Sequence, residues 1–122
     1  MTVTEGGTVE ALTREQILVS TLAHEDIPVP AWGRVVRVRE MTLLERSSFE
    51  IAVYSTRANG IRLRSELLVR ACTDPATGER LFLDEDAEAL GATGAKAVQV
   101  LFVPALRLSG LTEEEAEELG KA

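Results

Sequence analysis

Three segments of this chain repeat a spacing that marks the first turn of a helix. In each, a threonine precedes a glutamine or glutamate by three residues: Thr13 and Gln16, Thr42 and Glu45, and Thr112 and Glu115. In such a capping box the two side chains satisfy backbone amides that the first turn leaves free. The spacing therefore predicts a helix directly after each threonine.

Apolar periodicity predicts two longer helices between these starts. One covers residues 62 to about 73, and the other about 93–108, where Pro104 should kink or break it near Val100. The residues expected inward in these helices are Leu63, Leu67, Leu68 and Ala71, and Ala97, Val98, Leu101, Phe102, Ala105 and Leu106. In the helix after the second capping box, the expected inward side is Leu44, Ile51 and Ala52, with Phe49 and Val53 beside them. Asp84 is expected to cap a further short helix.

A small hairpin is predicted between the first two helices. Two prolines in residues 27–33 remove amide donors and push the residues before them into extended geometry. The next six residues alternate as in a strand, with Val36 and Val38 inward, and they can pair with this extended segment across the Trp-Gly turn. Residues 80–82 are a candidate third strand.

Length and composition favour one small, mostly helical domain. Of the 122 residues, 45% are hydrophobic but only 4% aromatic, so Leu, Val, Ile and Ala must fill the core. The sequence predicts an α+β fold, predominantly helical, a single small domain of about five to six helices with a β-hairpin near residues 27–39. We expect a disordered N-terminal tail at 1–11, the helical domain at 12–110 and a short acidic C-terminal helix at 111–122.

The charge of the chain restricts its partners. A net charge of −7 argues against binding to nucleic acid. Residues 34–70 carry eight arginines against four glutamates, whereas residues 111–122 carry five glutamates and one lysine. This polarity either steers a charged partner, favours head-to-tail self-association, or is an ordinary solvated surface. No apolar run is long enough for a membrane helix and no secretion leader is visible, so we expect a cytoplasmic protein.

Residues that carry catalysis or bind metals are sparse. His24 has no second histidine or cysteine nearby, and Cys72 lies among apolar residues, which favours a buried thiol. The acidic run at 84–88 lacks the central glycine of a calcium loop, and no glycine-rich phosphate loop is present. The sequence therefore predicts a non-enzymatic protein without catalytic, cofactor-binding or metal-binding residues.

Candidate contact residues lie at two places. Trp32, between a proline and a glycine, either anchors the small core or presents an amphipathic contact surface. The end of the last long helix and the acidic helix after it offer a second surface. The candidate partner-binding residues are Trp32, Leu108, Leu111, Glu114 and Leu119.

The order of these segments resembles the tail assembly chaperones of siphovirus-type phages, especially those of actinobacterial phages and prophages. The resemblance covers residues 12–122 and is carried by residues 13–18, 29–33, 36–42, 45–46 with 49–50, 80–82 with 85–86 and Leu90, and 108–115. Each motif is short, and their shared order and spacing carry the match. Two departures are Pro104, in a helix usually continuous in the family, and Ala31, where a glutamate is common.

The resemblance implies a specific role in assembly. A family member binds the tape measure protein, keeps it soluble and helps to recruit the major tail tube protein in the host cytoplasm, without being expected in the mature virion. It also implies that a translational frameshift often yields a longer second product. Two other classes stay open: a tail structural connector or completion protein, and a generic small acidic bacterial adaptor.

Overall fold

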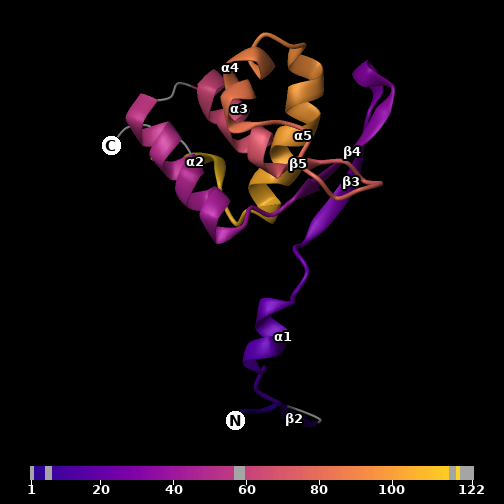
Figure 1. Ribbon diagram of the computed structural model, residues 1–122, viewed down its shortest axis with the longest axis vertical. Coiled ribbons are helices and arrows are strands. Elements are labelled where there is room, and N and C mark those ends of the chain that lie inside the picture. The colour runs from indigo at the N-terminus through magenta and orange to yellow at the C-terminus, as the bar shows by residue number, and fades with distance from the viewer. Residues whose placement is uncertain (1, 5–6, 57–59, 116–117, 119–122) are drawn as a thin grey trace.

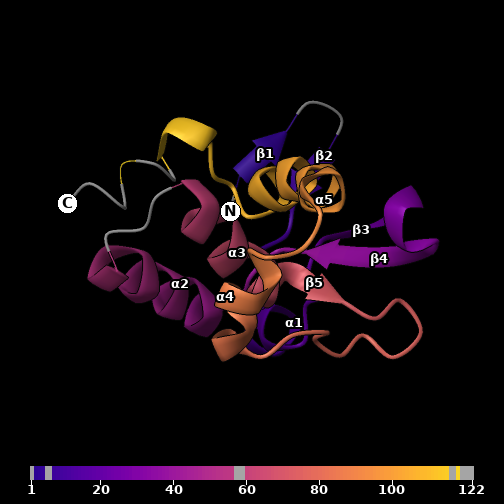
Figure 2. The same ribbon diagram turned by 90° about the horizontal axis from the view of Figure 1, so that it is seen from above.

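The computed structural model describes residues 2–4, 7–56, 60–115 and 118 of the chain. Its elements follow the order β1 (Thr2–Thr4), β2 (Gly7–Val9), α1 (Arg14–Leu18), β3 (His24–Val29), the 3-10 turn η1 (Pro30–Trp32), β4 (Arg34–Arg39), α2 (Leu43–Thr56), α3 (Gly60–Ala71), β5 (Cys72–Thr73), the 3-10 turn η2 (Asp84–Asp86), α4 (Ala87–Leu90) and α5 (Ala95–Leu108). Helix α3 packs against α2, α4 and α5, and α5 also packs against β3 and β4 (Figures 1 and 2). The predicted α+β, mostly helical class is confirmed.

The predicted hairpin is present and belongs to a three-stranded antiparallel sheet of order β3-β4-β5. Val29 lies opposite Arg34, and Gly33 closes the turn between them with a φ of 63°, a conformation that glycine adopts without strain. Val36 and Val38 are buried, as predicted. The third strand is β5, whereas the predicted segment at residues 80–82 contributes only an isolated bridge from Arg80.

The two longer helices bury the predicted residues. Every residue expected inward in α3 is buried, as are those of α5, except that Val98 is partly buried and packs against the core. Helix α5 runs through Pro104 as one element, so the predicted break is absent. Pro104 is itself buried in this helix, where its ring adds apolar contact although it supplies no amide. Cys72 is buried, as the sequence indicates.

The inward side of α2 differs from the prediction. Phe49 and Val53 are fully buried, whereas Leu44 and Ile51 are 84% and 66% exposed. Both pairs are apolar, and they lie on opposite sides of the helix because successive residues turn by about 100°. The side that packs inward also carries Glu45, which Arg39 holds against the body. The expectation that Leu44 and Ile51 face the core is therefore wrong.

The chain before β3 forms an arm, made of β1, β2, α1 and the residues up to Ala23, that extends away from the rest of the chain (Figure 1). Strands β1 and β2 pair antiparallel inside the segment expected to be a disordered tail, a pairing that the sequence does not predict. Helix α1 follows, with the predicted capping box between Thr13 and Gln16. It contains no buried residue. The boundary of the folded domain at residue 12 stays a prediction.

The chain after α5 folds back onto the core. Gly110 has a φ of 69°, and the Leu111 amide donates to the Leu106 carbonyl at 2.9 Å, which ends the helix. This return buries Leu111 in the core. The capping box of Thr112 and Glu115 is present next. Leu111, the first residue of the expected C-terminal segment, therefore packs in the core, and the boundary at residue 110 stays a prediction.

Candidate interaction surfaces

One side of α2 presents an apolar surface that no described part of the chain buries. Its members, here called the outer face of α2, are Leu43 (82% exposed), Leu44 (84%), Ile51 (66%) and Tyr54 (60%). At about 100° per residue these four fall within about one third of the helix circumference. Helix α2 lies at the margin of the helical body in both views (Figures 1 and 2). Exposed Ser47 lies on the same side, between the two ends of this face. Exposed apolar residues that share one side of a helix mark candidate interaction sites.

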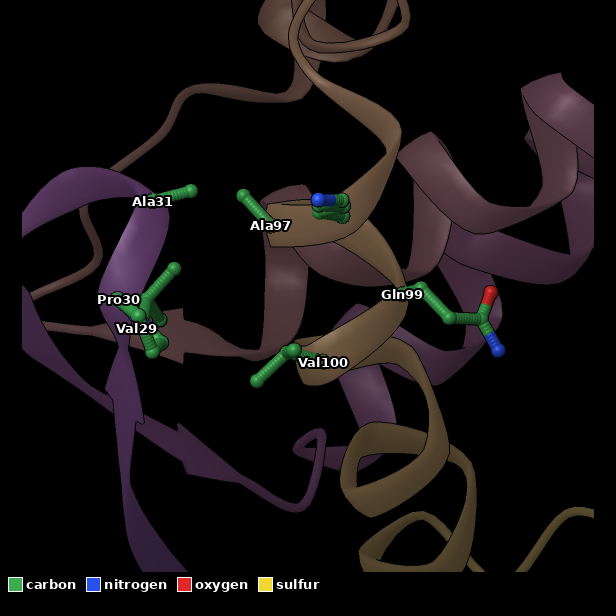
Figure 3. A pocket seen from close by; sticks show the side chains of 7 residues that line it. Val29, Pro30, Ala31, Ala97, Gln99 and Val100 are labelled. Carbon is green, nitrogen blue, oxygen red and sulfur yellow. The ribbon is translucent and has the colours of Figure 1, made fainter.

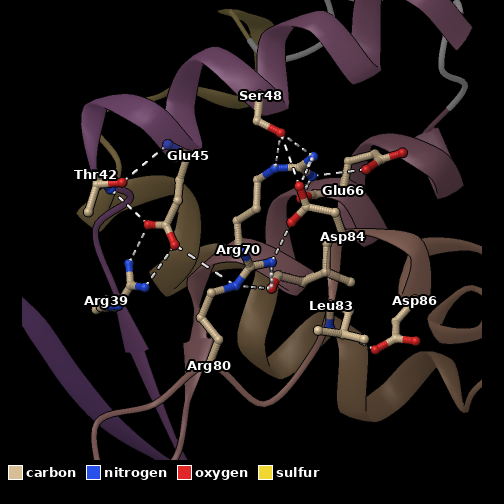
Figure 4. A network of polar contacts seen from close by, with 11 residues as sticks. Arg39, Thr42, Glu45, Ser48, Glu66, Arg70, Arg80, Leu83, Asp84 and Asp86 are labelled. Atoms are coloured by element: carbon tan, nitrogen blue, oxygen red, sulfur yellow. Dashed lines mark hydrogen bonds and ion pairs between the residues drawn. The ribbon is translucent and has the colours of Figure 1, made fainter.

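A salt bridge fixes the start of α2. Arg39, the last residue of β4, donates two hydrogen bonds to the Glu45 carboxylate at 2.7 and 2.9 Å (Figure 4). Glu45 also accepts from the Thr42 amide, completing the second predicted capping box. Burial raises the pKa of Glu45, but the hydrogen bonds from Arg39 and Thr42 outweigh it and leave the pKa below its ordinary value. The outer face of α2 is thus presented by a helix tied to the sheet.

A second polar cluster joins α2 to α3 and η2. Arg70, which is buried, donates to Ser48 at 2.8 Å and lies 3.4 Å from the Asp84 carboxylate (Figure 4). Arg80 donates to Asp84 at 2.7 Å. The hydrogen bond from Arg80 and the charge of Arg70 hold the pKa of Asp84 below its ordinary value. Asp84 therefore links these elements, and the expectation that it caps the short helix is wrong, because Asp86 accepts from the Leu83 amide instead.

Two apolar grooves flank the tip of the hairpin. One, of about 600 Å³, separates Val29, Pro30 and Ala31 from the N-terminal half of α5. Figure 3 shows Ala97 and Val100 pointing toward the hairpin across this groove, with Gln99 pointing away. The other groove, of about 730 Å³, lies between β4 and the loop after β5, and is lined by Trp32, Arg34, Val35, Val36, Asp74, Pro75, Leu81 and Phe82. Both are open hollows with few polar groups, which suits apolar contacts more than catalysis.

The described residues offer little reactive chemistry. Among them, no three histidines, cysteines or acidic residues gather as a metal site would require. Burial raises the pKa of the Cys72 thiol to about 12, which leaves too little thiolate for a nucleophile at neutral pH. No helix in this part of the chain has both the length and the apolar character to cross a membrane.

The candidate contact residues do not form one surface. Trp32 is partly buried against the core and lines the larger groove, whereas Leu108 lies at the far end of α5 and also packs against the core. Leu111 is buried, so the expectation that it is an exposed contact is wrong, while Glu114 is exposed. Leu119 lies outside the described residues.

The outer face of α2 was missed at the sequence level although a signal for it exists. The helix carries apolar residues on two opposite sides, a pattern that a search for a single inward stripe merges into one. Assigning each apolar residue its angle around the helix separates Phe49 and Val53 from the outer face. Which of the two sides of α2 is buried then depends on where the other elements of the fold pack.

Comparison with solved structures identifies a fold relative. The structure of the tail assembly chaperone of bacteriophage HK97 matches this chain with a TM-score of 0.54 and 16% sequence identity, covering 81% of this chain and 92% of the chaperone. This chain shares the fold of that chaperone. No family model matches the sequence, and no curated protein matches it. The shared fold agrees with the one that the sequence resemblance implies.

Proposed function

We propose that this chain is a phage tail assembly chaperone that binds the tape measure protein, keeps it soluble and helps to recruit the major tail tube protein. The fold shared with the HK97 chaperone and the ordered motifs from residue 13 to residue 115 support this role. On this proposal the protein acts in the host cytoplasm and is absent from the mature virion. A longer product made by translational frameshifting belongs to the same proposal.

The observation that carries the proposal is the outer face of α2. A long helical protein exposes apolar surface until the tail tube encloses it, and such surface aggregates unless another protein covers it. An amphipathic helix laid along the outer face would bury apolar residues of both partners. Because Arg39 and Glu45 hold α2 to the sheet, this contact requires no opening of the core.

The size of this face suits reversible binding. Burying four large side chains gains up to roughly 6–12 kcal/mol at about 1.5–3 kcal/mol each. Loss of translational and rotational freedom opposes association by an amount of similar size, on the order of 4–15 kcal/mol. We therefore expect moderate affinity, which lets a chaperone release its partner as the tube assembles. Trp32, Leu108 and Glu114 are proposed as secondary contacts, and a second copy of the chain as a further partner.

Co-expression with the tape measure protein of the same genome tests the proposal. The full chain should raise the soluble yield of that protein and be retained with it in a pull-down. A variant with Leu44→Glu and Ile51→Glu should lose both effects, because two buried charges would oppose the contact. Val103→Glu is the matched control, since Val103 is also apolar and exposed but lies on α5. Circular dichroism melts should show that both variants stay folded.

Three outcomes would contradict parts of the proposal. If the wild-type chain neither binds nor solubilises the tape measure protein, the chaperone role fails and an adaptor role takes its place. If it binds but the α2 variant binds equally well, the assigned surface is wrong. If mass spectrometry finds the chain in purified virions at structural copy number, a connector or completion protein is the better reading.

A further inference from the structure

The arm before β3 carries apolar side chains that nothing in the described chain covers. Leu12, Ile17, Leu18 and Val19 are each more than half exposed, although they lie in or beside α1. Two of them, Ile17 and Leu18, belong to the helix itself. An arm that stays in solvent is expected to carry charged or small side chains. Large exposed apolar side chains instead favour an arm that packs against another apolar surface.

Helix α1 is too short to be stable without a packing partner. It has five residues, and isolated helices below about 12–15 residues are marginal in water. Its capping box and the hydrogen bond from the Ser20 hydroxyl to the Ile17 carbonyl define both ends but bury nothing. Helix α1 therefore has defined ends although none of its side chains packs against another element. Such a helix is available to bind an apolar surface.

The arm is anchored to the body at Glu40, shortly before α2 begins. The Ala23 amide donates to the Glu40 carboxylate, and the Glu40 amide donates to the Ala23 carbonyl, both at 2.9 Å. The arm therefore leaves the body three residues before Leu43, where the outer face begins. Five residues span up to about 17 Å, so Leu18 can reach any point within that distance of Ala23. The three residues from Glu40 to Leu43 span at most about 10 Å, so Leu43 and Leu44 lie within this reach, whereas Ile51 lies about 12 Å farther along α2.

We infer that the arm is a strap, residues 12–19, which folds back about residues 20–22 and packs Ile17 and Leu18 on the outer face of α2 of the same chain. The structure shows the strap open, pointing away from the body (Figure 1). Closing joins two exposed apolar surfaces through a short tether. A tether of this length gives an effective concentration in the millimolar range, about what a weak apolar contact needs, and far above typical chain concentrations in solution.

The strap would regulate the contact proposed above, and this consequence rests on the proposed function. A closed strap covers apolar surface while no partner is present, and a helical partner must displace it. A strap closed nine-tenths of the time would weaken binding about tenfold, because only the open fraction is competent. The same chain would thereby stay soluble alone and still expose the outer face of α2 to its partner.

Disulfide trapping in the full chain tests closure without any partner. The variant with Leu18→Cys and Leu44→Cys should form an intrachain disulfide under mild oxidation at low protein concentration, seen as a faster-migrating monomer on a non-reducing gel. Cys72 can remain, because its buried thiol is a poor nucleophile. The matched control, Leu18→Cys with Val103→Cys, should form this product at least about tenfold more slowly, a difference of about 1.4 kcal/mol in barrier.

The other outcomes overturn the inference. Interchain dimers as the main product would assign the arm to a second copy. Equal trapping in the control would mean that the arm moves freely without docking. As a readout without cysteines, amide hydrogen exchange in residues 12–19 should speed up several-fold in the Leu44→Glu and Ile51→Glu variant; an unchanged rate would also count against the strap.

A binding assay then separates the strap from the proposed function. Deleting residues 1–20 should tighten binding to the tape measure protein several-fold if the strap competes for the outer face. If trapping succeeds but neither form binds that protein, the strap stands and the chaperone role fails. If both forms bind equally well and trapping fails, the chaperone role stands and the strap fails.

Discussion

The guanidinium of Arg70 lies 2.9 Å from the carboxylate of Glu66, one turn earlier on α3, and both side chains are only 3% exposed. Arg70 also donates to the Glu66 carbonyl and to Ser48 on α2, so the pair joins the two helices. Two charges buried this deeply oppose folding unless each has its partner. The pair is therefore a place where one substitution should have a large effect.

Breaking this pair should destabilise the fold strongly. Arg70→Met removes one of the two arginines that pair with the Glu66 carboxylate, and Arg62 stays bound to it at 2.7 Å. The free energy of unfolding should therefore fall by about 3 kcal/mol, the lower end of the cost of stranding a buried charge. Replacing both residues, as Glu66→Met with Arg70→Met, should cost less than the sum of the single changes, because neither member of the buried pair is left alone and Arg62, which also binds Glu66, is 36% exposed. Urea unfolding of the four proteins in the cycle gives the coupling energy. Strict additivity would show that the pair is not coupled.

Acid should weaken the attachment of α2. The folded-state pKa of Glu45 is below its ordinary value of 4.5, so its contribution is fully present above about pH 4.5 and is lost as the pH falls through the folded pKa. Asp84, also lowered from 3.8, acts in the same direction. Glu45→Gln should lower stability at pH 7 and flatten its decline between pH 5 and 3. Melting midpoints across this range test it, with the exposed Glu114→Gln as control. A profile for Glu45→Gln parallel to wild type would contradict the assignment.

Truncating the tryptophan should have an intermediate effect. Trp32 is partly buried against the core, so Trp32→Ala should cost roughly 2 kcal/mol, less than the 3–5 kcal/mol typical of a fully buried aromatic. Trp32→Phe should recover most of this loss. Circular dichroism is the appropriate probe, because Trp32 is the single tryptophan and fluorescence would vanish with it. A neutral Trp32→Ala would instead place the ring on a contact surface.

The end of the chain offers a pair of truncations that differ by two residues. Removing residues 113–122 keeps Leu111, whereas removing 111–122 takes a buried residue from the core. The longer deletion should therefore lower the free energy of unfolding by about 2 kcal/mol or more relative to the shorter one. Leu111→Ala in the full chain should show a similar loss. If both truncated proteins unfold at the same urea concentration, Leu111 does not support the core.

The sequence alone determined the features that depend on near neighbours. All three capping boxes join residues three apart, and the structure contains each of them. The apolar stripes of α3 and α5 and the turn at Gly33 likewise follow from local spacing and from the conformational freedom of glycine. Such signals need no knowledge of the rest of the fold.

The tertiary structure decided the features that depend on distant residues. Helix α2 has two apolar sides, and α3, which follows it, covers the side with Phe49 and Val53 while Leu44 and Ile51 stay exposed. Leu111 enters the core only because the chain reverses at Gly110. The sequence pattern shows that all of these residues are apolar, but it does not show which of them are buried. An apolar side chain contributes free energy of burial only where another element packs against it.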